Sequence, residues 1–142
     1  MPDHTIGLIG IGLLGTAMAE RLRHSGTQVL GYDIVDTRCH ELGSSGGRVA
    51  QSAAEVAEEC PFVLLSLPHS GSVCEVVAEL PIKKMRNHTI IDTTTGDPAT
   101  SAQLAESLES SGIGYVDATV AGSSEQARRG DIVIMAGGKP EI

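Results

Sequence analysis

The chain has 142 residues, enough for one domain, and 41% of them are hydrophobic, which is sufficient for a buried core. The formal net charge of −8 argues against a surface that binds nucleic acid or an anionic membrane. No apolar run reaches transmembrane length, and the three scattered cysteines form no Cys-x-x-Cys pair. The first predicted strand begins too early to leave room for a signal peptide, so we expect a cytoplasmic protein.

The first predicted elements are a strand, a glycine-rich turn and a helix. Residues 6–9 form a short apolar run, Gly10, Gly12 and Gly15 then give G-x-G-x-x-G, and apolar residues at helical spacing follow. In such a turn the first glycine permits the bend, the second lets a pyrophosphate approach the backbone, and the third allows close packing of helix and strand. The N–H groups and positive dipole of the helix start then face the phosphates. The pattern predicts dinucleotide binding.

A second apolar run, residues 28–32, ends at Asp33, which lies 18 positions after Gly15. A carboxylate at this place accepts hydrogen bonds from the adenosine ribose and repels a 2′-phosphate, so the sequence favours NAD over NADP. Arg38 is the competing feature, because a nearby arginine accommodates that phosphate. Since Arg38 lies five residues further on, on the next predicted helix, we give it less weight.

Strands and helices alternate along the rest of the chain. We expect strands at 48–50, 62–67, 89–92, 114–118 and 132–136, and helices at about 35–42, 52–59, 73–80, 97–111 and 124–129. This order predicts an α/β fold with a doubly wound, mostly parallel sheet of the Rossmann dinucleotide-binding type, and a single domain over residues 1–142. Ligands of such sheets bind beyond the carboxyl ends of the strands. The candidate site segments are therefore Asp33, residues 68–70, Thr93 to Thr95, and the residues after Ala118.

Two other kinds of site are considered and rejected. Residues 43–47 contain G-x-S-x-G, the pattern of a hydrolase nucleophile elbow, but a predicted helix precedes it where the elbow needs a strand. The five histidines are dispersed without metal-ligand spacing, so we predict no metal site. We expect them at the surface or at helix caps, with His69, beside Pro68, a minor candidate for contact with a cofactor.

Several ordered motifs resemble the β-hydroxyacid dehydrogenases, a family that includes 3-hydroxyisobutyrate dehydrogenase. Residues 9–19 resemble the family's opening fingerprint, and residues 92–98 resemble its D-x-S-T-x-x-P element. Residues 117–123 resemble its D-A-P-V-S-G-G substrate loop, and residues 134–138 resemble the strand end that closes its nucleotide domain. The resemblance implies hydride transfer between a nicotinamide cofactor and a small β-hydroxyacid such as 3-hydroxyisobutyrate.

The resemblance also implies roles for individual residues. The glycine turn would hold the phosphates, and residues at the strand ends would hold the adenosine and the nicotinamide ribose. The residues expected to bind the cofactor are Gly10, Gly12, Leu13, Leu14, Gly15, Asp33, Leu67, Pro68 and Thr95. Gly122 and Ser123 would offer backbone or hydroxyl donors to a substrate carboxylate. No metal is expected, and NADP is less favoured than NAD.

The chain departs from the family in several places. Leu13 and Leu14 replace a frequent Asn-Met pair, Thr119 replaces the loop's usual proline, and Ala121 replaces its usual serine. The family's catalytic lysine helix, G-x-x-G-x-G-x-x-x-K-x-x-N, and its all-helical domain do not occur in the 142 residues. We therefore assign no catalytic residue.

We interpret the chain as the NAD-binding domain of such a dehydrogenase without its catalytic half, inactive by itself. In the family the second domain covers apolar surface and builds a dimer, so the resemblance also implies a homo-oligomer. The alternative is a stand-alone module that binds a nucleotide or a partner without catalysis.

Overall fold

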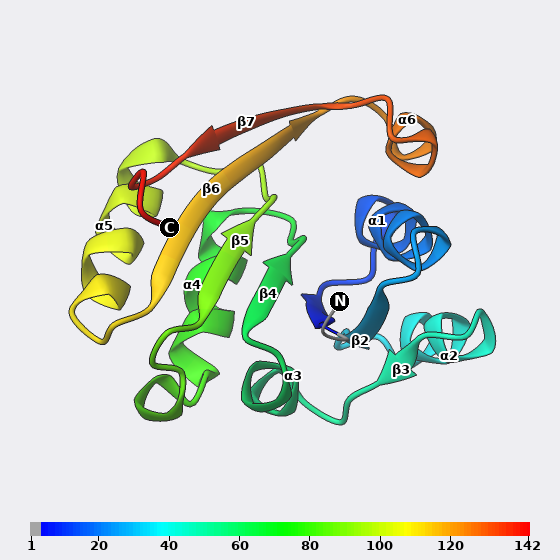
Figure 1. Ribbon diagram of the computed structural model, residues 1–142, viewed down its shortest axis with the longest axis horizontal. Helices are drawn as coiled ribbons and strands as arrows, with labels where there is room; N and C mark the ends of the chain where they lie inside the picture. Colours follow the sequence, from blue (N-terminus) through cyan, green and yellow to red (C-terminus); the bar gives the residue numbers. More distant parts are fainter. Residues whose placement is uncertain (1–3) are drawn as a thin grey trace.

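A computed structural model describes residues 4–142 as one seven-stranded sheet in the order β3-β2-β1-β4-β5-β6-β7 (Figure 1). Each neighbouring pair from β3 to β6 is parallel, and β6 and β7 are antiparallel. The predicted α/β fold with a mostly parallel sheet is therefore confirmed. The strands are β1 (Thr5–Ile9), β2 (Gln28–Tyr32), β3 (Arg48–Val49), β4 (Phe62–Leu65), β5 (Thr89–Asp92), β6 (Gly114–Ala121) and β7 (Val133–Gly137).

Helices cover both faces of the sheet and bury two separate cores (Figure 1). One core lies under α1 (Leu13–His24) and α2 (Asp36–Ser44), and the larger one lies under α3 (Ala53–Glu59), α4 (Ser70–Glu79) and α5 (Pro98–Glu109). The short η1 (Ile82–Lys84) follows α4, and α6 (Ser124–Arg129) packs beside α1. Because both faces are covered, the central strands β1, β4 and β5 consist mostly of apolar residues, as expected of a buried parallel sheet.

Side chains at the helix starts explain several of these boundaries. Ser52 caps α3 by accepting from the Glu55 N–H at 3.1 Å, as its capping sequence predicts. The Glu55 carboxylate reaches the N–H of Gln51, one residue before the cap, so the reciprocal bond of the box is displaced. Asp97 caps α5 by accepting from the Thr100 N–H at 2.9 Å, and these hydrogen bonds lower the pKa of its carboxyl.

Several strand predictions need correction, and β3 ends at Val49 rather than residue 50. β4 ends at Leu65 rather than residue 67, and the Leu67 N–H donates to the side chain of Thr94 instead of to a neighbouring strand. β6 continues to Ala121 rather than stopping at residue 118. The last strand lies at 133–137 and runs antiparallel to β6, since α6 has only six residues and returns the chain directly along the sheet's edge.

β7 leaves an apolar edge uncovered among residues 4–142. All five of its residues are exposed, and Val133, Ile134 and Met135 retain 63%, 56% and 55% of their accessible surface. Exposed apolar residues gathered on one strand typically mark an interaction surface.

Candidate functional site

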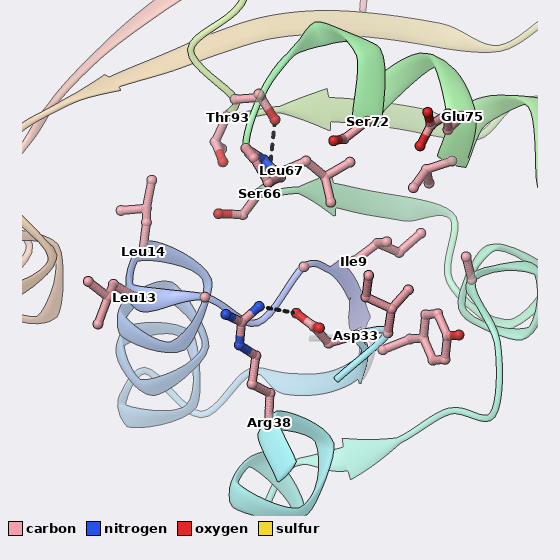
Figure 2. A pocket seen from close by; sticks show the side chains of 18 of the residues that line it. Ile9, Leu13, Leu14, Asp33, Arg38, Ser66, Leu67, Ser72, Glu75 and Thr93 are labelled. Carbon is pink, nitrogen blue, oxygen red and sulfur yellow. Dashed lines mark hydrogen bonds and ion pairs between the residues drawn. The ribbon is translucent and has the colours of Figure 1, made fainter. Parts of the chain in front are cut away.

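A cavity of about 530 Å³ opens at the carboxyl ends of β1, β2, β4 and β5 (Figure 2). It lies where the connections from β1 and β4 run to opposite sides of the sheet, which is where open α/β sheets bind ligands. Its volume suits a small molecule or cofactor. Eight residues predicted for the cofactor line it, namely Gly10, Gly12, Leu13, Leu14, Asp33, Leu67, Pro68 and Thr95.

Each of the three glycines of the turn is required, or free to vary, for a different structural reason. Gly10 has φ +96°, and a Cβ there would lie 2.1 Å from the carbonyl oxygen of Ser66. A Cβ at Gly15 would lie 2.2 Å from the carbonyl oxygen of Gly10, so this glycine lets α1 pack on the turn from behind the cavity. A Cβ at Gly12 would meet nothing within 4 Å. Only Gly12 therefore faces open space, at the place where a ligand would approach the backbone.

The start of α1 suits a negatively charged group. Its N-cap is Gly12, which has no side chain to occupy the first N–H groups, and the first turn contains no acidic residue. Basic residues lie in the last turn instead, where they match the opposite end of the helix dipole. Leu13, 80% exposed, lines the cavity without offering a hydrogen bond. Recognition of an anion here would thus use backbone N–H groups.

Asp33 follows β2 and is only 7% exposed. Its Oδ2 accepts from the Ile11 N–H at 2.7 Å and its Oδ1 from the Val35 N–H at 2.8 Å. The carboxylate therefore ties the glycine turn to the β2 end, a role that the sequence did not indicate. A carboxylate has about four acceptor positions, so Asp33 keeps capacity for a ligand hydroxyl beside these bonds.

Arg38 lies closer to the cavity than its position five residues after Asp33 suggests. It lies on α2, lines the cavity, and places its Nη1 3.3 Å from Oδ2 of Asp33 (Figure 2). Its side chain is 47% exposed, so the ion pair is open to water and weak. Arg38 can therefore leave Asp33 for a ligand anion at modest cost.

A buried network holds the end of β5 against the β4 turn. The Tyr115 hydroxyl donates to Oδ2 of Asp92 at 2.6 Å, and Oδ1 of Asp92 accepts from the Thr94 N–H at 3.0 Å. The Thr94 hydroxyl oxygen in turn accepts from the Leu67 N–H at 3.1 Å. Burial and the hydrogen bond to Asp92 raise the pKa of Tyr115. This network fixes the two loops that carry Thr95 and Leu67 into the cavity wall.

We expect Tyr115→Phe to lower the free energy of unfolding by about 1–3 kcal/mol, because one oxygen of buried Asp92 loses its donor. Urea unfolding followed by circular dichroism measures this change. Tyr32→Phe removes the same atom from the cavity wall and is the matched control, with an expected change below about 0.5 kcal/mol. Equal effects of the two variants would contradict the structural importance of the Tyr115 bond.

The same residue predicts a pH dependence. Because the pKa of Tyr115 is raised in the folded state, its contribution to stability is complete below the unfolded pKa of about 10 and is lost as the pH rises above it. As the pH rises from about 9.5 to 11, the free energy of unfolding of Tyr115→Phe should therefore fall less than that of the unaltered chain. Parallel urea titrations across this range check the expectation, and identical slopes would contradict it.

Gly122 and Ser123, predicted to bind substrate, do not line the cavity. Ser123 caps α6: its hydroxyl accepts from the Gln126 N–H, and its own N–H donates to Oε1 of Gln126 at 2.8 Å. The capping box therefore uses the N–H of Ser123, which is one of the two kinds of donor that we expected at this residue. The hydroxyl proton of Ser123 remains available for a ligand.

Sequence reasoning missed one wall of the cavity, a stripe along α4 at positions i, i+3, i+4 and i+7. The spacing of the valines correctly predicted the helix α4, but that spacing identifies the buried face of the helix. The cavity lies on the adjoining face, whose residues are Ser72, Glu75, Val76 and Glu79. The polar residues at the same helical spacing were the available signal.

Other predictions concern the remaining polar residues. His69 caps α4, where its Nδ1 accepts from the Ser72 N–H at 3.2 Å. Ser45, the serine of the rejected hydrolase pattern, is the C-cap of α2 and precedes a strand, so the rejection is confirmed.

Within residues 4–142, no group of three or more histidine, cysteine or acidic residues is arranged to hold a metal ion. None of the helices in this range is both long and apolar enough to span a membrane.

Comparison with known proteins decides what kind of domain this is. Residues 5–142 match the NAD binding domain of 6-phosphogluconate dehydrogenase. The chain belongs to this family. Similar proteins include the mitochondrial 3-hydroxyisobutyrate dehydrogenases of Mus musculus, 37% identical over 136 residues, and of Homo sapiens, 35% identical. These alignments cover 94% of the chain and 41% and 40% of the two relatives, so the chain spans about two fifths of their length.

A solved 3-hydroxyisobutyrate dehydrogenase of Mycobacterium tuberculosis, described with L-serine, has a TM-score of 0.92 and 26% identity to this chain. The superposition covers 97% of the chain and 47% of that protein. The chain is thus a nicotinamide-dinucleotide-binding domain of the oxidoreductase family that contains the β-hydroxyacid dehydrogenases, as its motifs predicted.

Proposed function

We propose that this chain binds NAD in the cavity and forms the nucleotide half of a dehydrogenase for a small β-hydroxyacid such as 3-hydroxyisobutyrate. The observation that carries the proposal is the open space over Gly12 at the uncapped start of α1, directly beside Asp33. A side chain at Gly12 would fill this space, so the cavity fits a pyrophosphate that approaches the backbone closely. Calorimetric titration of the 142-residue chain with NAD tests the proposal, and absence of binding would refute it.

The residues around the cavity then divide the cofactor between them. Gly10, Gly12, Leu13 and Leu14 would lie under the pyrophosphate, with Gly15 supporting the turn; Asp33 would accept from the ribose; Leu67 and Pro68 would pack on the adenosine side, and Thr95 would bond near the nicotinamide ribose. A bound nicotinamide cofactor would supply the acceptor for a hydride from the hydroxyl-bearing carbon of the substrate. We place the hydroxyl of Ser123 and the backbone of Gly122 near the substrate carboxylate.

We also propose that residues 1–142 act as one domain of a larger, oligomeric and cytoplasmic enzyme. The exposed apolar residues of β7 support a partner surface, because an isolated domain rarely leaves such a strand uncovered. The three cysteines are free in this structure, which agrees with a reducing compartment. We propose no nucleic-acid, membrane or metal partner.

We expect the chain to bind NAD at least about tenfold more tightly than NADP, a difference of about 1.4 kcal/mol, because the buried Asp33 carboxylate repels a 2′-phosphate. Asp33→Ala should narrow this ratio and also weaken NAD, since the same carboxylate holds the Ile11 N–H of the glycine turn. Calorimetric titration with both cofactors measures the two affinities.

The variant Arg38→Ala distinguishes the effect of Arg38 on cofactor preference from the effect of Asp33. If Asp33 determines the preference, this variant binds NAD about as well as the unaltered chain and NADP still more weakly, because the cation nearest Asp33 is gone. NADP binding equal to or stronger than NAD binding in the unaltered chain would show that Arg38 dominates the site.

A further inference from the structure

The α4 wall of the cavity lies at the end away from the phosphate turn. In Figure 2, Leu13 and Leu14 mark one end of the cavity, Glu75 lies toward the other, and Asp33 lies between them. A dinucleotide with its pyrophosphate over Gly12 and its adenosine ribose at Asp33 would therefore place its adenine toward α4. Residues 71–79 of this helix were not among the site segments expected from the sequence.

This end of the cavity combines apolar walls with two carboxylates. Val76 lines the cavity from α4, next to Glu75 in the chain, and an apolar side chain of this kind suits the face of a flat base. Glu75 and Glu79 line it one helical turn apart, and both are exposed. The ion pairs among residues 4–142 use other acids, so the structure gives these two carboxylates no ionic partner of their own.

The chemistry of the base distinguishes what such a wall would accept. Adenine presents a 6-amino group, a donor, where hypoxanthine presents a 6-oxo group, an acceptor. An ionised carboxylate only accepts hydrogen bonds, so it attracts the amino group and repels the oxo group. Glu75 lies in the middle of α4, whereas Glu79 is its last residue, about 6 Å further along the helix axis.

We propose that Glu75 accepts a hydrogen bond from the 6-amino group of the bound dinucleotide and makes the site select adenine over other purines. This inference rests on the proposed binding of NAD and adds a specificity residue to it. Glu75 does not contact the reacting atoms, so its effect is on cofactor affinity and base selection rather than on hydride transfer.

The test compares NAD with nicotinamide hypoxanthine dinucleotide, which differs only at the base, by calorimetric titration of the 142-residue chain. The unaltered chain should prefer NAD by about tenfold. Glu75→Gln should reduce this preference to less than about threefold, because its amide both accepts from an amino group and donates to an oxo group. Glu106→Gln, an exposed and charge-matched change on α5 outside the cavity, should leave the preference unchanged.

The possible outcomes are distinct. An unchanged base preference in Glu75→Gln, with NAD still bound, overturns the inference and leaves the proposed function standing. A loss of preference in Glu79→Gln but not in Glu75→Gln also overturns it, since the acceptor would then lie one turn further along α4. Failure of NAD to bind the unaltered chain overturns the proposed function and this inference together.

Discussion

Replacing Gly12 with valine should abolish cofactor binding in a chain that still folds. The space beside Gly12 is open in the structure, and its φ of −79° is accessible to any residue, so the fold tolerates a side chain there. The isopropyl group would instead occupy the position that we propose for the pyrophosphate. We expect NAD affinity to fall by more than about a hundredfold, or about 2.7 kcal/mol, in calorimetric titration.

Gly15→Ala is the matched contrast for this prediction. Its Cβ would lie 2.2 Å from a backbone oxygen of the turn, so α1 must shift and the midpoint of thermal unfolding should fall by several degrees. For Gly12→Val the circular dichroism spectrum and the unfolding midpoint should stay close to those of the unaltered chain. Near-normal NAD affinity in folded Gly12→Val would exclude the turn as the phosphate site.

The parts of the cavity that could be located from the sequence depend on local features. The turn could be assigned because φ at Gly10 and the close packing at Gly15 are requirements of a few adjacent residues, and only glycine meets them. Asp33 could be placed at the cavity because it directly follows an apolar strand. These features need only the order of strand, turn and helix, and that order is present in the sequence.

The parts that were missed depend on packing between elements distant in the chain. The Tyr115–Asp92 bond joins neighbouring strands, and nothing local to either residue indicates that the two are partners. Arg38 reaches Asp33 because α2 begins immediately after the β2 loop, which a count of residues does not reveal. The antiparallel direction of β7 was equally hidden, because its apolar composition suits either direction.

The Ser123 prediction shows a further limit. A serine before a helix is both a common N-cap and a common ligand contact, and the sequence cannot assign its N–H to one role. The structure gives that N–H to Gln126, three residues later, through a capping box. The S-x-x-Q spacing in the sequence is the pattern of such a capping box.

The 142-residue chain should bind NAD yet show no turnover of 3-hydroxyisobutyrate, glycerate or 3-hydroxypropionate. Within residues 4–142, the residues that line the cavity include no lysine or histidine to exchange a proton with the substrate hydroxyl. Lys84 pairs with Glu58 and Lys139 with Glu109, both away from the cavity. Absorbance of reduced cofactor at high protein concentration measures the activity.

The expected loss is large because two contributions to the rate are missing together. General acid–base assistance typically contributes about 10²–10⁴ in rate, and correct placement of the substrate contributes effective molarities of about 10⁵–10⁸ M. The cavity walls described for this chain provide acceptors and N–H donors for a nucleotide, but no lysine or histidine. Joining the chain to the lysine helix and all-helical domain of a related dehydrogenase should therefore restore turnover. Clear activity of the pure 142-residue chain would instead require a catalytic group within it, and His69→Ala would be the first variant to examine.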